Sequence, residues 1–455
     1  MDLIPKPDQI VSAAANVAQK MLYGGLADLR PMPRTLIDEG TLREVYHYRP
    51  RGTAREHGDP ILLVTPLAAP AICFDLRRGC SLVEHFVDGG RPTYLVEYGE
   101  VSFRNRSLGM EHWIDEAVPT AVEEVSKHAG GRPVHIVGWS LGGIFAMLTA
   151  ADRPDLPIAS VTVVGSPVDV AQVPLVAPLR PLLSLTDGRV LTPVYQVLGG
   201  APKPLVKWAF QLSSFQKLVT RPLAVIARLD DADFLAQLEA VDRFTAGMIA
   251  YPGRSFGQLY HRFVRTNALN TGRFELGGRT IELSAITAPV LVLAGATDGI
   301  APVGSVKAVV PLLTGAREVR FEIVPGGHLG MLTGRAARGS TWRVLDEWVG
   351  QWSTTTAAAP AARKTARKAA GKTVRKAPAA KAAPQAAAKK AAAKKRTTKP
   401  PRKPPRKSAV AATKARPSAP APAAPPVEPG DASSDSIGVN PTRRYGSAGS
   451  RSLAR

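Results

Sequence analysis

Six short apolar runs recur along the chain, and most of them are separated by segments long enough to form a helix. The runs are residues 61–64, 93–96, 134–137, 161–164, 290–293 and 320–324. Most consist of consecutive apolar residues, so we expect strands that are buried on both faces. Helical segments such as 81–89 and 114–128 lie between them. This alternation predicts an α/β fold with a mostly parallel sheet and helices on both faces.

The segments outside this alternation of strands and helices predict two further helices and a hairpin. Residues 9–30 can form a helix with an apolar stripe, which we expect to pack on the body rather than to anchor the chain in a membrane. Residues 35–37 and 44–48 predict a hairpin that turns at residues 38–40. The last helix is expected at 341–352.

The strand pattern stops between residues 164 and 290. Helical segments such as 205–212 and 234–250 replace it, with prolines between them. We therefore predict a helical cap, inserted at about residues 170–285, that lies over the strand ends.

The basic character of the chain is concentrated in one segment. The whole chain has a formal net charge of +22, and residues 353–455 hold 24 Lys and Arg against three acids, a balance of +21. This segment is rich in Ala, Lys and Pro and cannot build a core, so we predict a disordered basic tail after a folded body at 31–352 and a helix at 1–30. Such a tail is expected to bind a polyanion, either DNA, RNA, polyphosphate or an anionic membrane.

The rest of the sequence indicates where the protein is located and whether it needs a cofactor. Two cysteines cannot form a disulfide framework, and no stretch approaches the apolar length that spans a bilayer. The first residues lack the pattern of a secretory signal. We expect a cytoplasmic protein, with association at the nucleoid, a granule or a membrane surface through the tail. The sequence predicts no cofactor and no metal: residues 371–373, Gly-Lys-Thr, lack the earlier glycine of a phosphate-binding loop.

One motif carries chemistry. The run 134–137 leads directly into Gly138-Trp139-Ser140-Leu141-Gly142, and a helix-forming segment follows. Strand, G-x-S-x-G turn and helix together define a nucleophile elbow, in which the glycines allow a strained turn and the serine is exposed at its tip. Ser140 is therefore the predicted nucleophile.

A serine hydroxyl needs a base and an acid that orients the base, and on an α/β-hydrolase fold these follow the serine in the order acid, then histidine. Asp298 comes just after the run at 290–293, and His328 just after the run at 320–324. Asp169, one strand earlier, is the alternative acid. The other histidines precede the elbow, lie in its strand or lie in the insertion; they are His47, His57, His85, His112, His128, His135 and His261.

The oxyanion of an acyl-transfer intermediate requires backbone N–H donors. We expect one at Leu141, immediately after the nucleophile, and the second in the loop after residues 61–64, near Leu67.

The chain also resembles the polyhydroxyalkanoate synthase branch of the α/β-hydrolases over roughly residues 30–350. The similarity lies in residues 75–77 with 81–83, 94–99, 267–272, 277–283, 286–291 and 325–330. The resemblance implies the same nucleophile, acid and base positions, Ser140, Asp298 and His328. Two departures accompany it: the synthases use cysteine in the elbow, and Gly299 stands where a histidine is common in the family.

We expect an esterase, thioesterase or acyltransferase that acts on acyl or hydroxyacyl esters or thioesters, an acyl-CoA-like substrate included. A serine forms an ordinary ester with the acyl group, which favours hydrolysis or simple transfer over polymerisation. The first alternative is a synthase-like polymerase that uses serine, and the resemblance implies that such an enzyme works with a partner subunit. The second, of another class, is an idle hydrolase scaffold that tethers a polyanion through the tail.

Overall fold

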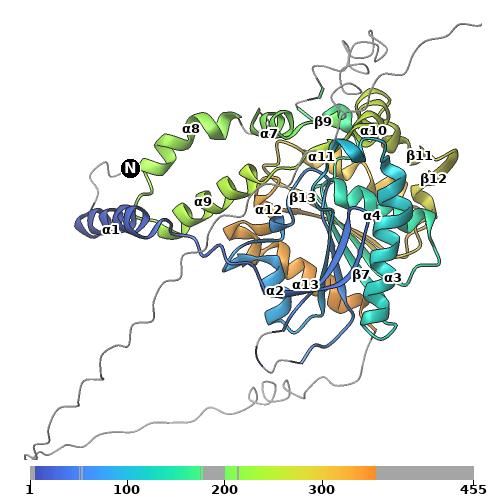
Figure 1. Cartoon of the computed structure of the whole chain (residues 1–455), viewed down its shortest axis with the longest axis horizontal. Helices are drawn as coiled ribbons and strands as arrows, with labels where there is room; N and C mark the ends of the chain where they lie inside the picture. The colour runs from blue at the N-terminus through green and yellow to red at the C-terminus, as the bar shows by residue number, and fades with distance from the viewer. Residues whose placement is uncertain are drawn as a thin grey trace, which may run out of the picture. The chain divides into compact units, whose positions relative to one another are not determined.

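The computed structural model describes residues 6–50, 52, 55–174, 176–177, 200–212 and 215–354. A sheet of eight strands runs through this part of the chain (Figure 1). In spatial order the strands are β1 (Arg34–Gly40), β2 (Arg43–Tyr48), β6 (Thr93–Glu97), β3 (Ile61–Val64), β7 (Val134–Trp139), β8 (Ile158–Val164), β13 (Val290–Gly295) and β14 (Val319–Val324). Neighbouring strands from β6 to β14 are parallel, whereas β2 is antiparallel to both β1 and β6.

Helices cover both faces of the sheet. One face carries α3 (Val118–His128), α4 (Leu141–Asp152) and α11 (Val303–Lys307), and the other carries α2 (Leu82–Asp88), α12 (Gly330–Thr333) and α13 (Thr341–Trp352). Figure 1 shows the sheet between α3 and α4 on one side and α2 and α13 on the other.

Strand β3 shows why its residues are all apolar. Leu62 and Val64 belong to the core on the α3 and α4 side, whereas Ile61 and Leu63 belong to the core under α2 and α13. All four side chains are fully buried. Successive side chains of a strand point to opposite faces, so a strand with a core on each side needs an apolar residue at every position.

The segment between β8 and β13 adds further elements. Its helices are α7 (Lys203–Leu212), α8 (Phe215–Ile226), α9 (Ala232–Ala246) and α10 (Gly253–Gln258), and its strand pairs are β9 (Gly200–Ala201) with β10 (Tyr251–Pro252) and β11 (Arg273–Leu276) with β12 (Arg279–Glu282). Another small pair joins β4 (Asp75–Arg77) to β5 (Cys80–Ser81). Short 3-10 segments lie at Ala71–Cys73, Phe103–Asn105, Val170–Gln172, Ala268–Thr271, Leu283–Ala285, Val310–Leu312 and Arg335–Gly339, and π-helical turns at His112–Ala117 and Leu259–Arg265.

The structure confirms the α/β fold and all six strands, but only five of them are buried. The sixth, β14, lies at the edge of the sheet, where most of its residues are half-buried and Ile323 is exposed, so the expectation of burial on both faces is wrong for this strand. The predicted first hairpin is also present, but its turn was placed too early: β1 continues to Gly40 and the turn lies at Thr41 and Leu42. Residues 38–40 remain in the strand, where Arg43 donates across the hairpin to Asp38 at 2.9 Å.

The insertion is not only helical, because the hairpin of β11 and β12 turns at Gly277 and Gly278 and buries Phe274 and Ile281. Part of the predicted cap and all of the tail after Thr354 lie outside the described residues.

The expectation for the first helix is wrong in its length and in its packing. Helix α1 (Pro7–Tyr23) ends well before residue 30, because Gly24 takes a left-handed conformation with φ 80° and closes it. Its apolar side chains are exposed, among them Ile10, Val11, Met21 and Leu22. Across the described residues no helix is long and apolar enough to cross a membrane.

Candidate active site

Ser140 lies in a sharp, strained turn between β7 and α4. Its backbone has φ 54° and ψ −121°, a conformation that L-residues rarely adopt. The turn places the serine beyond the carboxyl end of a central strand, where its side chain is only partly buried. This is the predicted nucleophile elbow.

The glycines of the elbow are required by close backbone contacts. A β-carbon on Gly138 would lie 2.6 Å from the carbonyl oxygen of Gly142. A β-carbon on Gly142 would overlap the carbonyl oxygen of Val64, at the end of β3. The first turn of α4 therefore rests directly on the end of β3 and the loop that follows it. A side chain on Gly142 would push these two segments apart, and one on Gly138 would push the end of β7 away from α4.

Two hydrogen bonds from the end of β8 hold the elbow in place. The backbone N–H of Ser140 donates to the carbonyl oxygen of Val164 at 2.8 Å. The hydroxyl of Ser166, which is fully buried, donates to the carbonyl oxygen of Ser140 at 2.5 Å. Ser166 was not recognised in the sequence; its position just after a strand at the same sheet edge was the available signal.

The structure brings Ser140, His328 and Asp298 together. The hydroxyl of Ser140 lies 3.0 Å from Nε2 of His328, and Nδ1 of His328 lies 2.8 Å from Oδ2 of Asp298. An ionised carboxylate can only accept, so Nδ1 carries the proton and Nε2 is left free to accept the proton of the serine hydroxyl. Residues 188 positions apart in the sequence thus form one continuous chain of hydrogen bonds.

The acid is fixed by its own loop. Oδ1 of Asp298 accepts the backbone N–H groups of Ile300 at 2.8 Å and Ala301 at 2.9 Å, while Oδ2 faces the imidazole. The acid loop also bonds to the loop that carries the histidine, because the N–H of Thr297 donates to the carbonyl oxygen of Gly326 at 3.0 Å. The side chain of Asp298 is fully buried, so water does not compete for the carboxylate.

Trp139 contacts His328 both through its indole N–H and through its ring. Its indole N–H donates to the backbone carbonyl of His328 at 3.1 Å, and its ring lies 5.0 Å from the imidazole ring. Phe244 of α9 packs edge-on against the same indole, with ring centroids 6.0 Å apart. Trp139 occupies a variable position of the motif, so no sequence pattern indicates this role.

The alternative acid lies elsewhere. Asp169 accepts hydrogen bonds from the backbone N–H of Ala171 and from the side chains of Gln172 and Asn267, at 2.7 to 3.1 Å. Asn267 in turn accepts the N–H of Val170 at 2.8 Å. Asp169 therefore joins the loop after β8 to the returning end of the insertion, and the acid that faces His328 is Asp298.

The two expected oxyanion donors lie on neighbouring segments, one at the start of helix α4 and one in the loop after β3. The N–H of Leu141 is the first of helix α4, and N–H groups of a first helical turn have no acceptor within the helix. Leu67 belongs to the loop after β3, which the Gly142 contact places against the start of α4. Ala68, with φ 66°, is held by the N–H of Ile249, which donates to its carbonyl oxygen at 2.8 Å.

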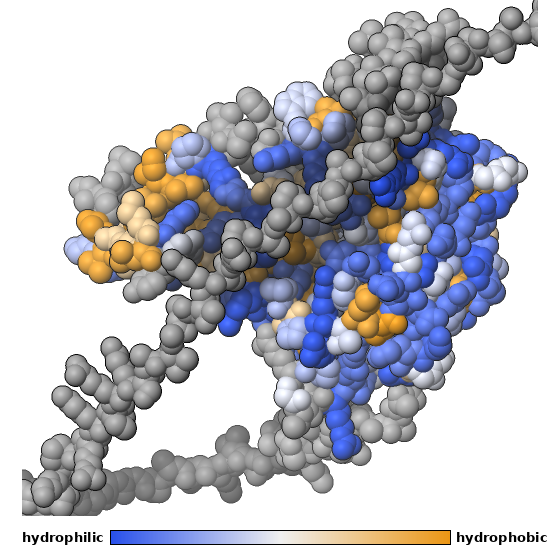
Figure 2. All heavy atoms as spheres, in the orientation of Figure 1, coloured by the Kyte–Doolittle hydropathy of each residue, from blue (hydrophilic) through white to orange (hydrophobic). Residues whose placement is uncertain are grey.

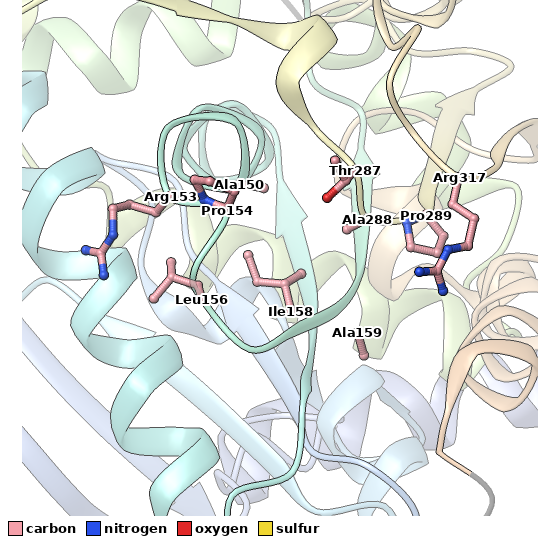
Figure 3. A pocket seen from close by; sticks show the side chains of 10 residues that line it. All are labelled: Ala150, Arg153, Pro154, Leu156, Ile158, Ala159, Thr287, Ala288, Pro289 and Arg317. Atoms are coloured by element: carbon pink, nitrogen blue, oxygen red, sulfur yellow. The ribbon is translucent and has the colours of Figure 1, made fainter.

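A separate cavity of about 120 Å³ lies at the opposite end of the sheet (Figure 3). It is lined by Ile158 and Ala159 at the start of β8 and by Pro289 just before β13. The cavity lies at the amino ends of β8 and β13, whereas Ser140 lies at the carboxyl edge of the same parallel sheet, so the cavity is not part of its site. Within the described part of the chain, no group of three or more His, Cys, Asp or Glu is arranged to hold a metal ion.

The fold and the elbow define a class. The sequence profile of the family described as the alpha/beta hydrolase fold matches residues 90–335, more than half of the chain. The chain therefore belongs to the α/β-hydrolase family.

Within this family the chain is similar to proteins named poly(3-hydroxyalkanoate) polymerase subunits. It is 22% identical to the poly(3-hydroxyalkanoate) polymerase subunit of Allochromatium vinosum over 355 residues, which cover 76% of this chain and 98% of that protein. It is 24% identical to the subunit of the same name from Synechocystis sp. over 282 residues, which cover 61% of this chain and 74% of that protein. A solved carboxyl esterase from Bacillus coagulans is 17% identical and covers 71% of this chain and 99% of its own, with a TM-score of 0.45.

Proposed function

We propose that this chain is a serine acyl-transfer enzyme in which Ser140 is the nucleophile, His328 the general base and Asp298 the residue that orients the base. The observation that carries the proposal is the position of His328, which lies within hydrogen-bond distance of both partners at once. The strained backbone of Ser140 supports it, because such strain is kept at functional sites.

The first half of the reaction follows from this geometry. Nε2 of His328 takes the proton of Ser140 as Oγ bonds to the carbonyl carbon of an acyl ester or thioester. The negative charge moves to the carbonyl oxygen, where the N–H groups of Leu141 and Leu67 are the proposed donors. The imidazolium then gives its proton to the departing alcohol or thiol, and an acyl ester on Ser140 remains.

The second half repeats these steps with a new nucleophile. His328 takes a proton from water or from an acceptor alcohol, the oxygen attacks the acyl-enzyme, and Ser140 recovers its proton. Water yields a free acid and an alcohol yields a new ester. Asp298 stabilises the imidazolium in both halves without taking up the proton itself.

The substrate class is inferred from the relatives. Proteins named poly(3-hydroxyalkanoate) polymerase subunits match most of this chain, which favours a 3-hydroxyacyl ester or thioester as the substrate. Ser140 stands where the resemblance implies cysteine. A serine ester retains less of the driving force of a thioester, so a single transfer to water or to one alcohol is favoured over repeated chain growth.

Labelling with a fluorophosphonate tests the nucleophile before any substrate is known. We expect one modified peptide that contains Ser140, because only an activated serine reacts with this probe at an appreciable rate. Ser140→Ala should abolish the labelling and lower the hydrolysis of acyl esters by on the order of 10⁴-fold or more.

The control is Ser102→Ala, which removes an exposed serine far from the elbow in the sequence and should leave both signals unchanged. Labelling that persists in the Ser140→Ala protein would show that another residue is the nucleophile.

A polymerase that uses serine is the second candidate, and the same relatives support it. Incubation with a 3-hydroxyacyl-CoA separates the two reactions. Free hydroxy acid with release of CoA indicates hydrolysis, whereas polymer with release of CoA indicates synthesis. If neither product forms while Ser140 is labelled by the fluorophosphonate, the acyl class rather than the nucleophile was assigned wrongly.

A further inference from the structure

Helix α1 is attached to the rest of the molecule by its polar edge. Asn16, which is buried, donates from Nδ2 to the carbonyl oxygen of Leu229 at 2.8 Å. Gln9 lies on the same edge and donates to Asp230 at 3.1 Å. Both acceptors belong to the turn between α8 and α9. The contact side of this amphipathic helix is therefore polar, the reverse of a helix that packs on a core.

The apolar side of α1 faces solvent. Four of its side chains are more than half exposed: Ile10 at 55%, Val11 at 69%, Met21 at 83% and Leu22 at 75%. At 100° per residue they centre on the side opposite Asn16. The end of α8 adds Leu223 at 72% and Ile226 at 67%. We refer to these six residues as the outer apolar face.

The outer apolar face is one region. α1 is bonded to the turn that directly follows Ile226, so the ends of α1 and α8 adjoin. Figure 2 shows apolar atoms gathered at the end of the molecule where Figure 1 places these two helices. Helix α7, which precedes α8 in the sequence, exposes Trp208 at 59%. Isolated exposed apolar residues are common, but a shared face of this kind marks a binding surface.

The charge around this face is positive. Residues 6–24 and 203–230, which contain α1, α7 and α8, hold seven Lys and Arg against two Asp, a balance of +5. Residues 1–352 as a whole hold 35 Lys and Arg against 34 acids, a balance of +1, so the rest of this part of the chain is at −4. Lys20 and Lys207 are exposed and form no ion pair with any described residue. Two of the seven cations, Lys203 and Arg221, pair with Glu100 and Asp242 outside these segments, at 3.2 and 2.5 Å. With these two acids included, the helices that expose apolar side chains still keep a balance of +3.

We propose that α1, α7 and α8 bind the surface of an anionic phospholipid bilayer, with the outer apolar face inserted among the lipids. Apolar side chains beside lysines are the composition of helices that lie in a membrane interface. Anionic lipid attracts the surrounding lysines, whereas a second copy of this chain would bring two positive surfaces together. The basic tail supplies another attraction to the same lipids, and stable attachment commonly takes two such signals.

Co-sedimentation of the full chain with vesicles tests this proposal. The vesicles contain phosphatidylglycerol and phosphatidylcholine in equal parts, or phosphatidylcholine alone. The full chain should bind the vesicles that contain phosphatidylglycerol at least about tenfold more tightly than the vesicles of phosphatidylcholine alone. The triple variant Val11→Glu, Met21→Glu, Leu22→Glu should bind the phosphatidylglycerol vesicles at least about tenfold more weakly than the unaltered chain, because three inserted side chains become charged.

Two control variants accompany the triple variant. Ile323→Glu changes a residue that is 53% exposed on β14, an edge strand of the sheet that is not part of the outer apolar face, and should bind as the unaltered chain does. Met21→Leu keeps an apolar side chain and should also bind normally. Circular dichroism and thermal unfolding check that each variant folds, and Met21→Glu alone replaces the triple variant if that protein does not.

Three results would overturn the proposal. Equal binding of the triple variant and the unaltered chain would show that the tail alone attaches the protein. Equal binding to neutral and anionic vesicles would remove the role of charge. A dimer in analytical ultracentrifugation that the triple variant dissociates would assign the outer apolar face to a second copy.

Discussion

At the scale of single residues, the proposed site depends on contacts that lie outside the side chains of Ser140, His328 and Asp298. Trp139 holds the backbone of His328 through its indole N–H, and Ser166 holds the backbone of Ser140 through its hydroxyl. Neither side chain takes part in the proposed proton transfers, and each acts on the backbone of a residue that does, so we treat both as positioning residues. Their effect should appear in the rate of the chemical step rather than in substrate binding, because small displacements of a base are costly in the transition state.

Replacement of the indole N–H tests this distinction. Trp139→Phe keeps an aromatic ring beside His328 and Phe244 but removes the donor to the carbonyl oxygen. We expect kcat for acyl ester hydrolysis to fall by roughly tenfold with little change in KM, since one hydrogen bond contributes about 0.5–1.5 kcal/mol. A rise in KM at constant kcat would instead mean that Trp139 contacts the substrate.

The two candidate acids give a matched pair of variants. Asp298→Asn should lower kcat by on the order of 10⁴-fold, because an amide does not hold the imidazole tautomer that the base requires. Asp169→Asn changes a carboxylate that binds Asn267 and the loop after β8, so activity should persist while thermal stability falls. The reverse order of effects in a steady-state assay would reassign the acid.

At the scale of elements, the sequence predicted what periodicity and order reveal. The five inner strands of the parallel sheet were predicted because each needs apolar residues towards two cores, whereas β14, at the sheet edge, was found from a run that also contains polar residues. The proximity of Ser140, Asp298 and His328 was predicted because the carboxyl ends of β7, β13 and β14 meet at one edge. The apolar stripe of α1 can be seen in the sequence, but the sequence does not show which molecule covers it. The contacts of Trp139 could not be predicted, because they form only when segments distant in the sequence meet.

Strand β7 contains a buried histidine that makes the stability of the fold depend on pH. His135 is fully buried, with Nδ1 2.8 Å from the hydroxyl of Ser160, and burial lowers its pKa from 6.5 to about 4. Between these values the unfolded chain binds a proton that the folded chain does not, so stability falls as the pH falls from 6.5 to about 4. This residue should account for a loss of about 3 kcal/mol in the free energy of unfolding.

The pH series needs a variant in which this position does not titrate. His135→Gln retains a hydrogen-bonding side chain, so the free energy of unfolding should decline less steeply over the same pH range. Urea denaturation at several pH values measures the difference between the two proteins. Parallel curves for the unaltered chain and the variant would show that His135 is already protonated in the folded state at these pH values.

At the scale of the whole molecule, the tail starts at a fixed point far from Ser140. The N–H and hydroxyl of Thr354 bind the carboxylate of Asp59, which is fully buried, at 2.6 to 2.8 Å. Nε2 of His135 lies 3.1 Å from the hydroxyl of Ser353. Asp59 and His135 lie at the amino ends of β3 and β7, so the tail leaves from the edge of the sheet opposite the elbow.

Shortened chains separate the tail from the body and show where the body ends. A chain of residues 1–354 should keep acyl ester hydrolysis and lose the binding of DNA, because 21 of the 22 net positive charges are removed. In the full chain, the logarithm of the binding constant should fall linearly with the logarithm of the salt concentration, as counterions are released from phosphates.

A chain of residues 1–352 also loses the partners of Asp59, and a buried carboxylate without them should cost about 1–3 kcal/mol of stability. Thermal unfolding of the two shortened chains measures that cost, and equal melting temperatures would place the end of the body before Ser353. Loss of hydrolysis in the 1–354 chain while Ser140 still reacts with the fluorophosphonate would make the tail part of the enzyme rather than an independent polyanion-binding segment.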